Sequence, residues 1–71
     1  MERNLYFIDS YGKYRLLYKD VEEDRVFKLI NSFLNDHKYI SYYVRSWETK
    51  EGTMYDVGSH TEFFLWGVHN D

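Results

Sequence analysis

Cysteine is absent from this chain, which excludes disulfide bonds and zinc sites built from thiolates. Apolar runs long enough to cross a membrane are absent too, and the first residues lack the basic segment followed by an apolar one that marks a signal peptide. No proline, repeat, low-complexity segment or linker divides the 71 residues. We therefore expect one domain over residues 1–71, in a cytoplasmic protein that does not engage a membrane.

Strong charge of either sign is missing as well. The net charge is −3, with acidic and basic residues interspersed, so the composition favours neither a polyanion-binding protein nor a mimic of DNA. Aromatic residues are abundant instead: eight Tyr, five Phe and two Trp make up 21% of the chain. Because each buried ring removes about 150–250 Å² from water, we expect a core of few but large side chains.

The segment Asp20 to Lys38 predicts an amphipathic helix, because its apolar residues recur at three- and four-residue spacings. The residues of this stripe are Val26, Leu29, Ile30, Phe33, Leu34 and His37. Asp20 followed by Glu23 has the spacing of a capping box, which predicts where the helix begins. A single helix cannot bury such a stripe alone, so the flanking segments must supply a sheet for it.

Two short runs rich in Tyr, Phe, Leu and Ile precede the helix, Leu5 to Ser10 and Lys13 to Lys19. The Tyr11-Gly12 pair between them predicts a hairpin. A two-residue loop would place Tyr11 at positive φ, which is unfavourable for a bulky residue. A longer turn with Gly12 in the left-handed conformation is therefore an equal alternative.

Further strands are predicted after the helix. Tyr39 to Glu48 alternates in polarity, and Thr49 to Gly52 has the composition of a four-residue turn. The returning strand is interrupted at Gly58-Ser59, which we interpret as a bulge or bend, and resumes from Thr61 to Trp66. Gly67 to Asp71 is predicted to be a frayed tail. The predicted fold is α+β in the order ββαββ, with one helix on one face of an antiparallel four- to five-stranded sheet.

The turn that follows Glu48 also predicts a register. If it is tight, Trp47 lies opposite Met54, and Arg45 lies opposite Asp56. The second pair would then form an ion pair across the two strands.

One helix covers only one face of such a sheet, so the other face is predicted to stay open. Its composition of Trp, Tyr, Met and Arg is typical of protein interfaces, and apolar patches of this kind are rare on monomers without partners. The candidate binding residues are Tyr43, Arg45, Trp47, Met54, Phe64 and Trp66. We expect them to bind another protein.

Two alternatives remain open at this point. A twin subunit could cover the same face in a homodimer. Tyr43 and Trp47 could instead stack on single-stranded nucleic acid or a nucleotide, although the glycine-aromatic consensus of such sheet proteins is absent and the net charge is negative, so we do not favour nucleic acid.

Catalytic chemistry has little support in the sequence. His60 and Glu62, with Asp56 just upstream, form the one cluster of an imidazole with carboxylates, but a metal site needs three or four converging ligands. Motifs for a nucleophile or a phosphate-binding loop are absent. We expect no enzyme, no metal and no cofactor.

The segment from Tyr55 to Leu65 contains an aspartate, a glycine-serine pair and then an acidic residue before two phenylalanines. This segment resembles small uncharacterised accessory proteins of Gram-positive bacteriophages and prophages, which are also short. The resemblance covers a limited part of the chain and transfers no functional residues. It implies a protein made in the cytoplasm of an infected bacterium, in a group that includes inhibitors of host enzymes and proteins that sequester small ligands.

Overall fold

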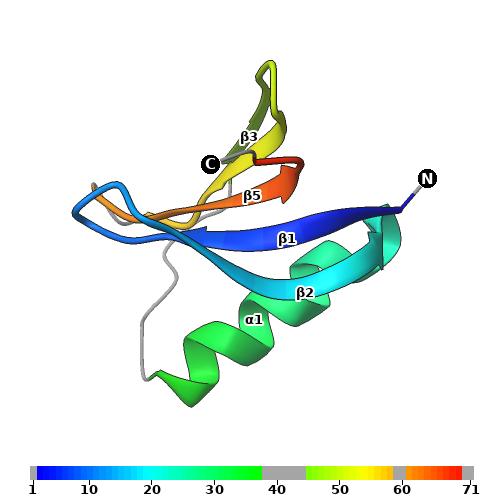
Figure 1. The fold of residues 1–71 in the computed structure, drawn as a ribbon. Helices are drawn as coiled ribbons and strands as arrows, with labels where there is room; N and C mark the ends of the chain where they lie inside the picture. Colours follow the sequence, from blue (N-terminus) through cyan, green and yellow to red (C-terminus); the bar gives the residue numbers. More distant parts are fainter. Residues whose placement is uncertain (1, 38–44, 59–60, 70–71) are drawn as a thin grey trace.

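The computed structural model describes residues 2–37, 45–58 and 61–69. The elements in these ranges are β1 (Glu2–Ile8), β2 (Tyr14–Glu22), the 3-10 turn η1 (Glu23–Arg25), α1 (Val26–Asp36), β3 (Arg45–Glu48), β4 (Gly52–Asp56) and β5 (Phe63–Gly67). The five strands form one antiparallel sheet in the order β2-β1-β5-β4-β3, and α1 lies against one face (Figure 1). The predicted α+β class, with one helix and an antiparallel sheet, is confirmed.

The first hairpin uses the longer of the two predicted turns. Gly12 has a φ of 79°, in the left-handed region that favours glycine. The Asp9 carboxylate holds the turn by accepting hydrogen bonds from the backbone N–H groups of Tyr11 at 2.9 Å and Lys13 at 3.0 Å.

The helix begins later than the sequence predicts, and the predicted capping box at Asp20 is wrong. β2 continues through Asp20 to Glu22, where Glu22 pairs with Glu2 of β1. Asp20 itself has a φ of 56°, and its N–H donates to the side chain of Asn4 at 3.2 Å. Strand pairing thus replaces the first helical turn, because it also buries the Val21 side chain in the core.

The core fills the space between α1 and the sheet. The Phe33 ring lies 4.8 Å from Phe7 and 5.5 Å from Phe64, measured between centroids. The core residues are Leu5, Phe7, Val21, Val26, Ile30, Phe33, Leu34, Tyr55, Val57, Phe64 and Trp66. The helical stripe is therefore confirmed at its centre, whereas Leu29 is half-buried and His37 is exposed.

The hairpin of β3 and β4 approaches β5 closely because glycines face each other. Gly52 pairs with Gly67, and a Cβ on Gly67 would collide with the Glu51 carbonyl oxygen. That oxygen instead accepts a hydrogen bond of 2.8 Å from the Val68 N–H. The predicted frayed tail is therefore wrong for Gly67 to His69, since Gly67 belongs to β5 and His69 contacts Glu51 at 2.7 Å.

Phe33→Ala is expected to lower the free energy of unfolding by about 3–5 kcal/mol, because it removes a ring that touches both sheet and helix. Urea denaturation measures this loss. The same substitution at Phe27, which lies on the same helix but is half exposed, should cost about 1 kcal/mol or less. Equal losses for the two variants would contradict the assignment of the core.

Gly67→Ala is expected to destabilise the protein by about 1–3 kcal/mol, because the added methyl group forces the Glu51 carbonyl away from β5. Gly12→Asn is the control, since no atom lies within 4 Å of a Cβ there and Asn tolerates the left-handed conformation. Thermal unfolding of both variants gives the comparison. An unchanged melting temperature for Gly67→Ala would show that a methyl group fits between the two backbones.

Candidate functional site

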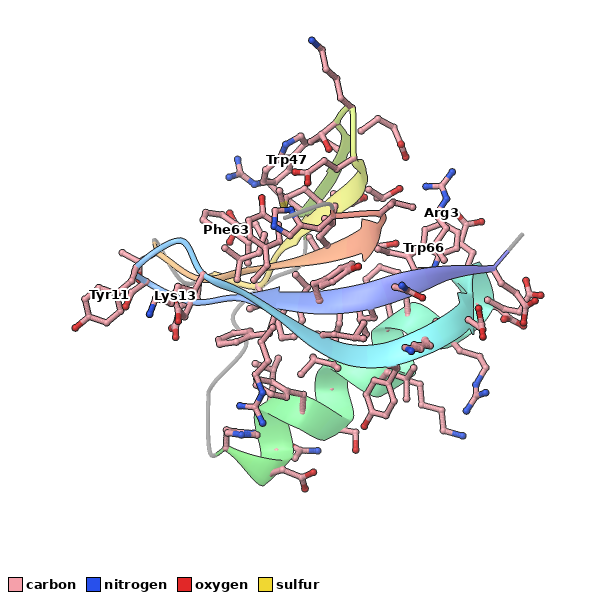
Figure 2. All side chains as sticks on the ribbon, viewed as in Figure 1. Arg3, Tyr11, Lys13, Trp47, Phe63 and Trp66 are labelled. Carbon is pink, nitrogen blue, oxygen red and sulfur yellow. The ribbon has the colours of Figure 1, made fainter. Side chains whose placement is uncertain are left out.

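Three of the predicted binding residues lie on the face of the sheet that points away from α1, which we call the far face. The predicted register is confirmed, with Trp47 opposite Met54 and Arg45 opposite Asp56. Figure 2 shows Trp47 on this side of the sheet, opposite α1. A further predicted residue, Tyr43, lies outside the residues that the structure describes.

Phe64 and Trp66 were predicted on the far face, and this prediction is wrong. Only 1% of Phe64 and 3% of Trp66 is exposed, and both rings belong to the core under α1. The reason is that the chain reverses its direction between β4 and β5, with Gly58 at a φ of 97°, instead of continuing as one bent strand. β5 then runs antiparallel beside β4 and pairs Tyr55 with Phe64, which turns the even-numbered residues of β5 towards the helix.

Phe63 and Leu65 occupy the far-face positions instead. The backbone pairing places Leu16, Tyr6, Leu65, Met54 and Trp47 in one row across all five strands. Leu65 at the centre of this row is fully buried, whereas Leu16 and Trp47 at its two ends are exposed. The exposed apolar surface is therefore concentrated at the sheet edges and not spread over the whole far face.

The edge at β3 carries the larger cluster. Trp47 is 41% exposed, and Phe63 meets it edge-on at 6.2 Å between ring centroids (Figure 2). The Arg45 guanidinium lies 5.9 Å from the centre of the same Trp47 ring, within range of a cation–π interaction. We call Arg45, Trp47, Met54 and Phe63 the Trp47 patch.

Asp56 fixes the position of Arg45 in this patch. Its carboxylate is buried and accepts hydrogen bonds from the Arg45 guanidinium at 2.8 Å and from the Gly58 N–H at 2.9 Å. The Arg45 side chain remains 66% exposed. A buried anion thus anchors a cation that still faces solvent next to an exposed indole.

A second cluster, which the sequence did not indicate, joins the turn before β4 to the tail and to β2. The His69 ring stacks on Tyr14 at 3.7 Å, and its Nδ1 lies 2.7 Å from a carboxylate oxygen of Glu51. The Tyr14 hydroxyl donates to the other oxygen of Glu51 at 3.2 Å. Burial, and then the nearby Glu51 carboxylate, raise the pKa of Tyr14 above its ordinary value.

These three side chains are 18 or more residues apart in the sequence and carry no motif, so only the tertiary structure reveals the cluster. The side chains of Tyr14, Glu51 and His69 bind each other, and these contacts hold the segment of Val68 and His69 against the sheet.

The other predicted cluster falls partly outside the described residues, because His60 does. Asp56 of that cluster is bound to Arg45. Among residues 2–37, 45–58 and 61–69, no three His, Asp or Glu side chains are arranged to hold a metal ion. No helix in the same ranges has the length and apolar character needed to cross a membrane.

Comparisons with protein-family models, with curated proteins and with solved structures found no match.

Asp56→Ala is expected to lower the free energy of unfolding by about 1.5–3 kcal/mol, because it leaves the Gly58 N–H and the Arg45 guanidinium without their acceptor. Asp36→Ala, at an exposed position at the end of α1, should change it by no more than about 0.5 kcal/mol. Urea denaturation of the two variants checks this. Similar midpoints for both would mean that Asp56 does not anchor the patch.

Proposed function

We propose that this chain is a small non-enzymatic protein-binding module that captures an extended segment of another protein along β3. The observation that carries the proposal is Trp47, an exposed indole on the outermost strand, flanked by Phe63 and Arg45. Trp and Arg are the residues that most often dominate the binding energy of protein interfaces.

The edge position of β3 supports a strand as the bound element. Within the described residues the sheet ends at β3, and all four residues of this strand are exposed. An added strand would pair with the outer backbone groups of β3, while its side chains would contact those on the sheet surface.

The opposite edge is less suited to pairing. The register of β2 against β1 shifts on both sides of Leu5, and Asp20 adopts positive φ. Such irregularities and charged residues, here Arg15 and Lys19, are features by which sheet proteins protect an edge from further pairing.

The side chains of β3 define the partner's chemistry. Arg45 and Trp47 are two residues apart and share the far face, so an added strand would place two of its own alternate side chains beside them. An aliphatic or aromatic side chain fits against Trp47, and a carboxylate fits beside the exposed Arg45 guanidinium.

The resemblance of residues 55–65 to bacteriophage accessory proteins supports a host protein as the partner. In that setting, the module works in the cytoplasm of the host and inhibits the protein whose segment it holds. A second copy of this chain is the competing occupant, because two β3 strands could pair with each other in a homodimer.

Trp47→Ala is expected to weaken capture of the partner by about 30-fold or more, since loss of a central Trp removes a dominant contact. The measurement uses immobilised wild type to isolate a protein from host lysate, followed by titration of that protein against each variant. Tyr11→Ala is the matched control, because Tyr11 is an aromatic residue exposed in the β1–β2 turn, and it should bind as wild type does.

Equal affinity of the Trp47→Ala and Tyr11→Ala variants for that protein would refute the proposal, provided that both have the urea midpoint of the wild type. Light scattering at two concentrations tests the competing homodimer. A mass that doubles with concentration in the wild type, but not in Trp47→Ala, would assign β3 to self-association instead.

A further inference from the structure

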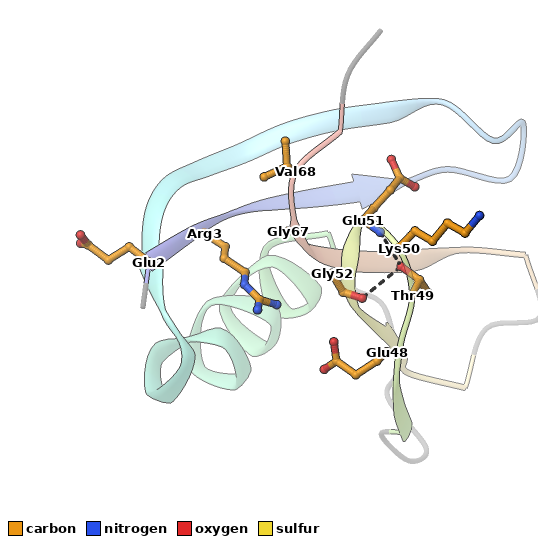
Figure 3. Close-up of a pocket in the computed structure, with 9 residues that line it drawn as sticks. All are labelled: Glu2, Arg3, Glu48, Thr49, Lys50, Glu51, Gly52, Gly67 and Val68. Carbon is orange, nitrogen blue, oxygen red and sulfur yellow. Dashed lines mark hydrogen bonds between the residues drawn. The ribbon is translucent and has the colours of Figure 1, made fainter.

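A cleft of about 640 Å³ lies away from the Trp47 patch, between the start of β1 and the turn that joins β3 to β4. Its lining residues are Glu2, Arg3, Glu48, Thr49, Lys50, Glu51, Gly52, Gly67 and Val68 (Figure 3). Since the two glycines leave no side chains at the point where β4 meets β5, the charged groups determine what the cleft can bind.

Arg3 is held in a fixed position within this cleft. Its guanidinium lies 4.5 Å from the centre of the Trp66 ring, in a cation–π contact. The Trp66 ring is itself buried and anchored, because its Nε1 donates to the Val21 carbonyl oxygen at 2.8 Å. The five N–H donors of Arg3 have no carboxylate partner among the described residues.

Glu48 faces Arg3 from the opposite wall. One oxygen of its carboxylate accepts a hydrogen bond of 2.6 Å from the Thr53 hydroxyl, which orients the group. Figure 3 shows Arg3 and Glu48 pointing into the opening from its two sides, while Glu2 and Lys50 point away from it. Within the residues that the structure describes, the two opposite charges form no ion pair with each other.

The Tyr55 hydroxyl responds to both charges. Burial raises the pKa of Tyr55, the carboxylates of Glu23 and Glu48 raise it further, and the Arg3 guanidinium lowers it. The cation and the anion therefore act on one region and not on separate parts of the surface.

The Arg3 guanidinium and the Glu48 carboxylate thus share one opening without contacting each other. Together they provide complementary contacts for a ligand that carries both charges. From this arrangement we infer that the cleft binds a small zwitterion, with a carboxylate on Arg3 and an ammonium group on Glu48. The planar guanidinium accepts a carboxylate through two parallel hydrogen bonds. A dianion such as phosphate is disfavoured, because Glu48 would repel it.

Free amino acids and short peptides both carry an ammonium group and a carboxylate. They differ in the distance between these two charges, which increases with length. We would titrate glycine, glycylglycine and triglycine into the ¹⁵N-labelled wild-type protein and follow the two indole N–H signals. Trp66 reports on the cleft beneath Arg3, and Trp47 serves as an internal control on a different strand. The inference predicts a saturable shift of the Trp66 signal with at least one member of the series, and the best length identifies the class of ligand.

Removing either charge of the best ligand, by N-acetylation or by C-amidation, should weaken binding by about tenfold or more. Arg3→Gln should weaken binding of the unmodified ligand to a similar extent. Binding of the amidated ligand should not change, because that form has no carboxylate to contact Arg3. Arg15→Gln, which removes an exposed cation from β2, should bind as the wild type does.

Three results would overturn the inference. The first is the absence of a Trp66 shift with all three ligands. The second is an acetylated or amidated form that binds as tightly as the unmodified ligand, and the third is wild-type affinity of Arg3→Gln for the unmodified ligand. Inorganic phosphate that binds more tightly than the best zwitterion would likewise assign the cleft to anions alone. If Arg3→Gln does not fold, as shown by loss of the dispersed Trp66 signal, Glu48→Gln replaces it, because a Gln amide oxygen can still accept the hydrogen bond from Thr53. Glu48→Gln should bind the unmodified ligand more weakly than the wild type does, but bind the acetylated ligand, which has no ammonium group, equally well.

Discussion

The hydrogen bond from the Trp66 indole to the Val21 carbonyl oxygen joins two strands that are not neighbours in the sheet. It ties the final strand to the end of β2, across the β1 strand that separates them. A buried indole N–H needs such a partner, and the carbonyl oxygen that it uses belongs to Val21, in the part of β2 that the sequence predicted to be helical. The same ring then supports the Arg3 guanidinium. The end of β2, the core and the Arg3 side chain of the cleft thus meet at one buried ring.

Local patterns in the sequence predicted the parts of the fold that local forces determine. The helical stripe around Ile30 and Phe33 follows from the helical period, and the pairing of Trp47 with Met54 follows from the length of a tight turn. The start of the helix and the faces of β5 depend instead on distant partners. Asp20 has the residue type of a cap but lies within β2, where its N–H donates to the Asn4 side chain of β1. The chain reverses between β4 and β5, and the resulting pairing of Tyr55 with Phe64 determines which residues of β5 face the helix.

The candidate site was predictable only where it rests on the β3–β4 hairpin. Arg45, Trp47 and Met54 follow from the hairpin register, whereas Phe63 enters the patch through the pairing of β5 with its neighbours. Part of the far face is also closed to solvent, since Leu65 is buried there. The surplus of apolar surface on this face is therefore smaller than the composition suggests, and its larger cluster surrounds one indole. A small, well-defined patch of this kind is better suited to a narrow segment than to a broad, flat partner.

The position of β5 has a consequence for how the protein is made. This strand is the last of the five to be synthesised, yet it lies at the centre of the sheet and pairs with both β1 and β4. The two hairpins on either side have no contact through the sheet until it is inserted between them. The growing chain on the ribosome can therefore form hairpins and a helix, but its sheet assembles only after residues 63–67 have emerged.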